Sequence, residues 1–239
     1  MDKEKTIYID PYTSIDSNKI KKEIFLGKGN WGSVYRFDND KAIKIIDHNG
    51  NNEQYEIISF IKNLNLPNFY KIYDILYTMN FSLKEYAGTI SKYYQTKDID
   101  IYTTSSSYLL DSFNALSESM NILGQHQITA YDFCNKNILL TEEGLIAIDV
   151  DFYGKMENDI QKRTIKRNMK QLKESVLHRL LIFNLHYHHK NDFDISQNED
   201  INKAICTLLN LDNSTDIKQF NKILSKYKYP IDYIKKKTK

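Results

Sequence analysis

The chain has 239 residues, 41% hydrophobic and 27% charged, which excludes a disordered chain, a collagen and a coiled coil. Its 33 Lys and Arg residues nearly balance 31 Asp and Glu residues, so the net charge of +2 does not favour nucleic acid or an anionic membrane as partner. No apolar run approaches the roughly 18 residues of a membrane span. The charged residues 1–5 are not followed by the apolar stretch that a signal peptide requires. We therefore expect a cytoplasmic protein, while export as an effector by a route without a signal peptide stays open.

The first third of the chain has the pattern of a sheet. Strand-like segments occupy residues 22–26, 33–37 and 41–46, and the turn residues Asp38-Asn39-Asp40 predict a tight hairpin between the last two. Further strand candidates are residues 69–77 and 81–86.

One helix is predicted between these strands, over residues 52–64. Asn51 or Asn52 is placed to cap its start, and Pro67 lies beyond its end. Its apolar residues recur at helical spacing, at Ile57, Phe60, Ile61 and Leu64.

The rest of the chain is predicted to be mostly helical. Helices are expected over residues 108–123, 164–183, 201–209 and 216–227. A second tight hairpin is expected where Glu142-Glu143-Gly144 separates two short apolar segments. The prediction is an α+β fold with two lobes: residues 1–87 with a five-stranded sheet and one helix, and a helical lobe at 88–239.

A glycine-rich run, Gly27-Lys28-Gly29-Asn30-Trp31-Gly32, lies between two predicted strands. Glycines let a backbone approach phosphate oxygens closely. A dinucleotide-binding turn would lead into a helix, whereas a strand follows here, which is typical of a nucleotide-covering flap. The alternative is an ordinary glycine-rich hairpin turn.

Lys44 lies in the apolar strand Ala42-Ile43-Lys44. An unpaired buried ammonium is costly, so a lysine in this position requires an anionic partner. The alternative is an edge-strand lysine that faces water.

Two polar segments follow the long predicted helix. In the first, Asp132 and Asn137 lie five residues apart in a loop that leads into an apolar strand. An aspartate so placed can orient a hydroxyl proton, and an asparagine can bind a metal, although a helix-to-strand turn explains them as well.

In the second segment, Asp149 and Asp151 occupy alternate positions after an apolar strand, so their side chains point the same way. Two such carboxylates repel one another unless a cation neutralises them, and Mg²⁺ prefers oxygen ligands. The alternative is a pair of surface acids.

Taken in order, these four signals resemble the protein-kinase-like superfamily over residues 24–154. The resemblance implies ATP and Mg²⁺ as ligands. It assigns Lys44 to the phosphates, held by Glu56 of the following helix, or by Glu53 as second choice. The nucleotide-binding residues it implies are Gly27, Lys28, Gly29, Gly32, Val34, Ala42, Lys44 and Glu56.

The same resemblance makes residues 83–88 the hinge, with adenine bound near Glu85 and Ala87. It makes Asp132, Lys44 and Asn137 catalytic, and it gives the metal to Asn137 with Asp149 or Asp151.

The chain also departs from the family. Ala130-Tyr131-Asp132 lacks the arginine that usually precedes the catalytic aspartate, Cys134 replaces a common lysine, and Lys84 is polar where an apolar residue is usual. The segment Ile148-Asp149-Val150-Asp151 is similar to aminoglycoside phosphotransferases.

The expected function is an ATP-dependent phosphotransferase that acts on a hydroxyl, first a protein Ser/Thr kinase. The alternatives are a small-molecule kinase and a pseudokinase that binds nucleotide or a partner without catalysis.

Overall fold

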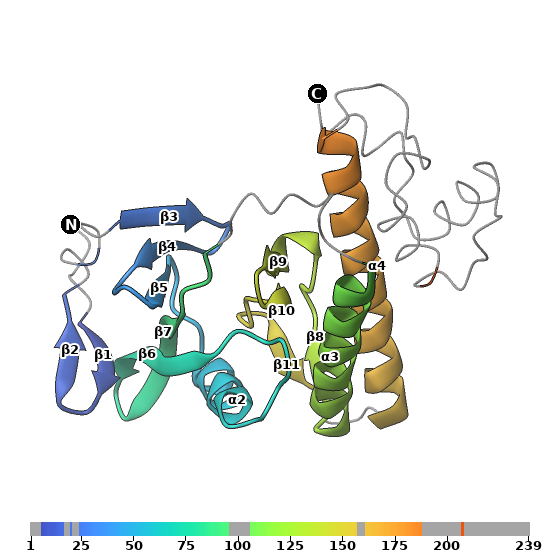
Figure 1. Cartoon of the computed structure of the whole chain (residues 1–239). Helices are drawn as coiled ribbons and strands as arrows, with labels where there is room; N and C mark the ends of the chain where they lie inside the picture. The colour runs from blue at the N-terminus through green and yellow to red at the C-terminus, as the bar shows by residue number, and fades with distance from the viewer. Residues whose placement is uncertain are drawn as a thin grey trace. The chain divides into compact units, whose positions relative to one another are not determined.

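The computed structural model describes residues 6–16, 20, 24–95, 106–156, 161–187 and 207. They form mixed α and β structure, as the sequence predicts, divided into two compact units. The first unit holds residues 1–65, 70–95 and 149–157, and the second holds residues 66–69, 96–148 and 158–239. Within the described residues, the first unit is rich in strands and the second is dominated by two long helices (Figure 1).

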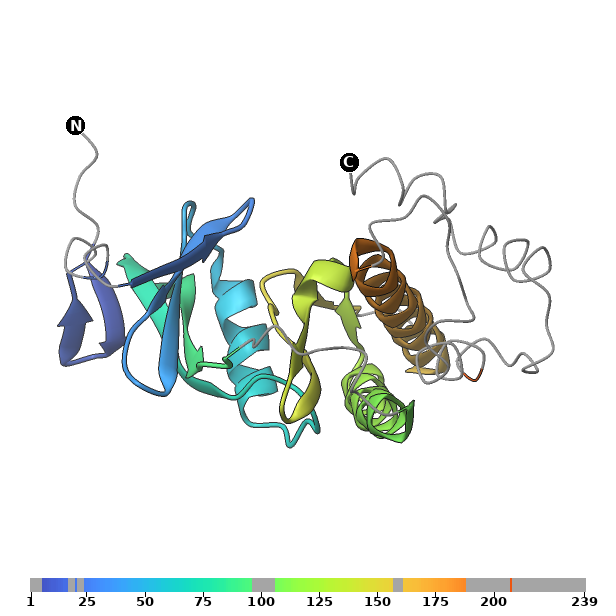
Figure 2. The ribbon, with the colours of Figure 1, turned by 45° about the horizontal axis from the view of Figure 1, so that its top comes forward.

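The described part of the first unit is built on a seven-stranded antiparallel sheet, which curls, as Figure 2 shows. Its strand order is β2-β1-β6-β7-β5-β4-β3. The bounds are β1 Ile7–Asp10, β2 Thr13–Ile15, β3 Ile24–Lys28, β4 Gly32–Arg36, β5 Lys41–Ile46, β6 Ile72–Asn80 and β7 Leu83–Lys92. Strands β3 to β7 correspond to the five predicted ones, and β1 and β2 extend the sheet beyond β6.

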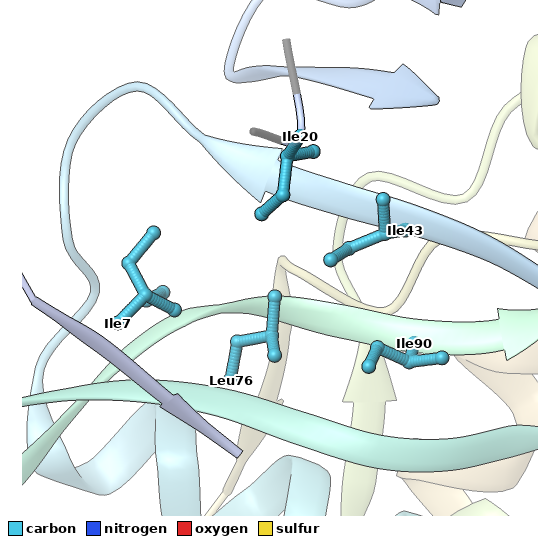
Figure 3. Close-up of a cluster of buried hydrophobic side chains, with 6 residues drawn as sticks. Ile7, Ile20, Ile43, Leu76 and Ile90 are labelled. Atoms are coloured by element: carbon cyan, nitrogen blue, oxygen red, sulfur yellow. The ribbon is translucent and has the colours of Figure 1, made fainter. Parts of the chain in front are cut away.

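One face of this sheet carries an apolar cluster (Figure 3). Its buried members are Ile7, Ile20, Ile43, Leu76, Ala87 and Ile90. Because side chains alternate along a strand, Ile43 on this face directs Lys44 to the opposite face.

Helix α2 (Asn52–Lys62) packs against β6 and β7. Its start is capped by Asn51, whose side chain accepts a hydrogen bond from the Gln54 amide at 2.8 Å, as predicted. The buried residues of the helix are Ile57, Ile58 and Ile61. Phe60, which the predicted apolar face included, is 43% exposed, so the buried face is rotated from the predicted one.

A β-bulge interrupts β7 beside Lys44. Leu76 pairs with Gly88 and Tyr77 pairs with Tyr86, which leaves Ala87 as an extra residue. Gly88 has a φ of +147°, and a Cβ there would overlap the Lys44 carbonyl oxygen, so only glycine fits.

Two predictions for this part of the chain, the lobe boundary and the hinge, are wrong because β7 continues through the bulge. The lobe boundary expected after residue 87 falls inside β7, and the first unit continues to residue 95. The hinge expected over residues 83–88 is not a connecting segment but part of the same strand, which pairs with β6 along this stretch and with β5 from Gly88 onward. A glycine inside a strand commonly marks a bulge, which is the physical reason for both errors.

The second unit contains α3 (Ser106–Gln125), β8 (Ile128–Ala130), β9 (Ile138–Thr141), β10 (Gly144–Ala147) and α4 (Gln161–Tyr187). Strands β9 and β10 form the predicted hairpin. Helices α3 and α4 pack side by side (Figure 1), and Gly124 lets α3 approach Ile165 closely.

Helices α3 and α4 confirm two of the predicted helices, whereas those expected over residues 201–209 and 216–227 lie outside the described residues, apart from residue 207. In the part of the chain that the structure describes, no helix combines the length and apolarity needed to cross a membrane.

Candidate functional site

The first unit brings together Lys44 of β5 and two aspartates from the segment that precedes β11 (Tyr153–Lys155). Lys44 Nζ lies 2.6 Å from Asp149 Oδ2 and 2.6 Å from Asp151 Oδ2. The exposed side-chain fractions are 17% for Lys44, 30% for Asp149 and 4% for Asp151. The predicted anionic partner of the strand lysine therefore exists, but it is this pair of aspartates.

Asp151 is held from several sides. The Tyr86 hydroxyl donates to Asp151 Oδ1 at 2.6 Å, and the Gln54 side-chain amide donates to the Asp151 carbonyl oxygen. The Asp151 amide donates in turn to Asp149 Oδ1 at 3.2 Å. Asp149 has a φ of 69°, in the left-handed region that non-glycine residues seldom adopt and that clusters at functional sites.

Burial and charge act against each other in this cluster. Burial tends to lower the pKa of the Lys44 ammonium, but Asp151 and Asp149 outweigh it and the pKa is raised. Burial, followed by repulsion from Asp149, raises the pKa of Asp151, although Lys44 and Tyr86 oppose that rise. With both carboxylates ionised, two negative charges share one ammonium, and the cluster carries a surplus negative charge.

Three buried tyrosines surround the carboxylates: Tyr70, Tyr86 and Tyr153. Burial, together with the nearby aspartates, raises the pKa of each phenol well above its ordinary value of 10.0. Their hydroxyls therefore stay protonated at neutral pH and remain able to donate hydrogen bonds.

The assignment of Glu56 as the partner of Lys44 is wrong. Glu56 and Glu53 are both exposed, and among the described residues Lys44 forms ion pairs only with the two aspartates. Gln54 is the α2 residue that reaches the cluster. The rotation of the helix explains the error, because Gln54 lies four residues before the buried Ile58, and Glu56 four before the exposed Phe60.

The glycine-rich run forms the predicted strand–turn–strand, in which Gly27 and Lys28 lie on β3 and Gly32 begins β4. The Gly29 amide donates to the Gly32 carbonyl at 2.9 Å. A Cβ at Gly32 would overlap the Ile45 carbonyl oxygen, whereas a Cβ at Gly27 would meet nothing within 4 Å. Packing explains Gly32, while the space beside Gly27 is open to a ligand.

Two predicted nucleotide contacts share a sheet face with Lys44. Val34 pairs directly with Lys44 across β4 and β5, and Ala42 precedes Lys44 by two residues. The turn of the glycine-rich run is joined to the aspartate segment, because the Trp31 and Phe152 rings meet edge to face with centroids 4.9 Å apart.

The two predicted adenine contacts, Glu85 and Ala87, both lie on β7. Ala87 is 1% exposed and belongs to the apolar cluster. Glu85 accepts a hydrogen bond from Asn80 at 2.6 Å, beside a cavity of about 460 Å³ that also touches Asn49 and Tyr8. In the described part of the first unit, neither residue forms a hydrogen bond with Lys44, Asp149 or Asp151.

The second unit holds Asp132 and Asn137 in one loop. The Asn137 side-chain amide donates to the Asp132 carbonyl at 2.9 Å, and the Asn137 carbonyl accepts from the Ile148 amide at 2.8 Å. The Asp132 side chain is exposed. With its Nδ2 engaged, Asn137 keeps its Oδ1 as an acceptor for a ligand or a metal.

Helix α4 supports this loop through residues that the sequence analysis missed. Asn168, fully buried, accepts from the Ala130 amide at 3.2 Å and donates to the Ile128 carbonyl at 2.9 Å. Ser175 donates to the Phe133 carbonyl at 3.0 Å. Asn168 is a polar residue on the apolar face of the helix predicted over residues 164–183. A buried polar side chain requires hydrogen-bond partners, and this position is the sequence signal that could have identified it.

Among the described residues, no three His, Cys, Asp or Glu side chains gather as a metal-binding group. No protein-family model matches the chain, and no curated protein matches it.

Proposed function

We propose that the protein is an ATP-dependent phosphotransferase with a two-lobed kinase-like fold, in which the two described units correspond to the lobes. The single observation that carries the proposal is the cluster of Lys44, Asp149 and Asp151, on the sheet face that also holds Val34. A buried lysine shared by two carboxylates is a charge arrangement suited to exchange with a polyphosphate and its cation.

The β3–β4 hairpin supports the phosphate half of this proposal. Gly27 leaves its surroundings open, so the backbone is accessible to phosphate oxygens. Lys44 supplies the positive charge, and Val34 and Ala42 provide an apolar surface for the base.

The donor set fits a hard divalent cation, because it consists of carboxylate oxygens with a surplus negative charge. We assign the cation to Asp149, the more exposed aspartate of the cluster, while Asp151 positions Asp149 and Lys44. When bound, Mg²⁺ would neutralise charge on the transferred phosphoryl group. Asp132 orients the acceptor hydroxyl.

The first acceptor class is a protein Ser or Thr hydroxyl, and the second is a small alcohol. The second is favoured by the short connection from Asp151 to the start of α4 at Gln161, which leaves little chain for docking a peptide. A pseudokinase is the other candidate, because the α2 residue that reaches the cluster is the neutral Gln54.

The test combines binding and transfer. The melting temperature of the full chain is measured with ATP alone and with ATP and Mg²⁺, because stabilisation grows with ligand concentration over its dissociation constant. We expect a clear rise with both. Labelled ATP is then offered with the protein itself, generic protein acceptors and aminoglycosides.

Variants refine the result. Asp149→Asn is expected to lower Mg²⁺-dependent transfer more than Asp151→Asn, and the reverse ranking would move the metal to Asp151. Absence of any thermal shift under either condition removes the nucleotide site, whereas a shift without transfer to any acceptor supports the pseudokinase.

A further inference from the structure

We propose that the Lys44 ammonium is a built-in counter-ion that excludes a free divalent cation from Asp149 and Asp151, so that the cation binds tightly only with a polyphosphate that draws Lys44 away. This inference concerns the regulation of the same site, and its polyphosphate half rests on the proposed function.

The first argument is that every carboxylate oxygen in the cluster is in contact with the ammonium or with a hydrogen-bond donor, although Asp151 Oδ2 has only the ion pair with Lys44 and no hydrogen bond. Lys44 Nζ contacts Oδ2 of both aspartates at 2.6 Å. Asp149 Oδ1 accepts from the Asp151 amide, and Asp151 Oδ1 accepts from the Tyr86 hydroxyl. A cation that binds these carboxylates must therefore displace an existing partner.

The second argument identifies the partner that can leave. The Asp151 amide belongs to the aspartate segment, and Tyr86 is fully buried in β7, so neither moves without local unfolding. Lys44 is attached through a flexible four-carbon side chain, and its ammonium can change partners by rotation alone. Cation and ammonium thus compete for the same two oxygens.

The third argument concerns where Lys44 can go. No third carboxylate of the described residues forms an ion pair with it, since Glu53 and Glu56 are exposed and Gln54 is neutral. Without another anion, release of a buried ammonium is costly. Phosphate oxygens provide that anion, which couples cation binding to polyphosphate binding.

The experiment measures Mn²⁺ binding to the full chain without nucleotide, from the electron paramagnetic resonance signal of free Mn²⁺. Lys44→Met is expected to bind Mn²⁺ at least about tenfold more tightly than wild type, because the competing charge is gone. In Lys44→Met, Mn²⁺ should also raise the melting temperature more than in wild type.

The matched control is Lys62→Met, which frees Asp74 from an ion pair of 3.5 Å between partly exposed side chains and should leave Mn²⁺ affinity unchanged. Adding Asp149→Asn to Lys44→Met should abolish the gain. Equal affinity in wild type and Lys44→Met overturns the inference.

Wild-type protein provides a second readout if Lys44→Met does not fold. Lysine labelling by reductive methylation, read by mass spectrometry, should increase at Lys44 as Mn²⁺ rises to saturation. Unchanged labelling with Mn²⁺ bound means that both cations occupy the carboxylates together, which contradicts the proposal.

None of these arms contains nucleotide, so they separate the inference from the proposed function. If Lys44→Met gains Mn²⁺ affinity but the melting temperature of wild type does not change with ATP, the proposed phosphotransferase function is contradicted and the counter-ion role of Lys44 is supported. If ATP raises the melting temperature of wild type but Lys44→Met gains no Mn²⁺ affinity, the counter-ion role is contradicted and the nucleotide site is supported.

Discussion

The two groups of polar side chains differ in what holds them. In the first unit, Lys44, Asp149 and Asp151 are largely buried and are held mainly by one another's charges. In the second unit, Asp132 is exposed, and its loop is held through backbone carbonyls by Asn137 and helix α4. In the first group a change of charge therefore also changes the contacts that hold the fold, whereas in the second the Asp132 carboxylate can be altered without altering the contacts that hold its loop. The following changes test that separation.

Asp132→Ala should lower phosphotransfer by about 10²–10⁴-fold while leaving stability and nucleotide affinity nearly intact, because its loop contacts use the backbone. Steady-state transfer from labelled ATP and a melting curve measure both. Asp111→Ala, another exposed aspartate, is the control. A large loss of stability would show that the scaffold depends on the carboxylate.

Asn168→Ala should lower the free energy of unfolding by about 2–4 kcal/mol, because it leaves buried backbone groups of β8 unpaired. Denaturant titration measures the change, and transfer activity should fall with it. Asn114→Ala on the exposed side of α3 should change stability by less than about 0.5 kcal/mol. Unchanged stability in Asn168→Ala would assign the support of the loop to other contacts.

Gly32→Ala should lower the free energy of unfolding by about 1–3 kcal/mol, because the added Cβ would overlap the Ile45 carbonyl oxygen. Gly27→Ala, with open space around it, should leave stability nearly unchanged and weaken ATP binding instead. Denaturant titration and nucleotide titration of both variants separate packing from ligand approach. A Gly27→Ala protein with normal ATP affinity would remove that residue from the site.

Tyr86→Phe should lower the free energy of unfolding by about 1–3 kcal/mol, because it removes the donor to Asp151 Oδ1. Tyr12→Phe, at a side chain that is 98% exposed, is the control and should be neutral. Denaturant titration compares them. Equal stability would mean that the charges of the first group do not need this hydroxyl.

Stability should also fall as the pH rises above about 10, by on the order of 1 kcal/mol per pH unit. The raised pKa values of Lys44, Tyr70, Tyr86 and Tyr153 mean that the folded chain keeps protons that the unfolded chain releases. Urea titrations from pH 8 to pH 11 measure the slope, which should be shallower in Tyr86→Phe. A flat profile would contradict the burial of these groups.

Local patterns predicted the hairpins and helices, because turn residues and apolar spacing act over a few neighbours. The turn at Asp38-Asn39-Asp40 and the cap at Asn51 are such cases, and both are confirmed. The segment at Asp149 was recognised for the same reason, since two acids follow an apolar strand.

The remaining features depend on contacts between distant residues. The burial of Ile58 rather than Phe60, which selects Gln54, is decided by how α2 packs on the sheet. The apolar face of the predicted helix marks Asn168 as a buried polar residue, but its partners lie on β8, about forty positions earlier in the chain, and no local pattern identifies them.

The bulge at Ala87 and Gly88 has a consequence for how this protein tolerates change. One extra residue lets Tyr86 donate to Asp151 and Thr89 form a hydrogen bond with Tyr70, while Ala87 joins the apolar cluster. Deleting that residue would invert the remainder of the strand and carry the phenol to the opposite side, a disturbance that no compensating point mutation restores. Sequence drift in this stretch should therefore proceed by replacement and not by insertion or deletion.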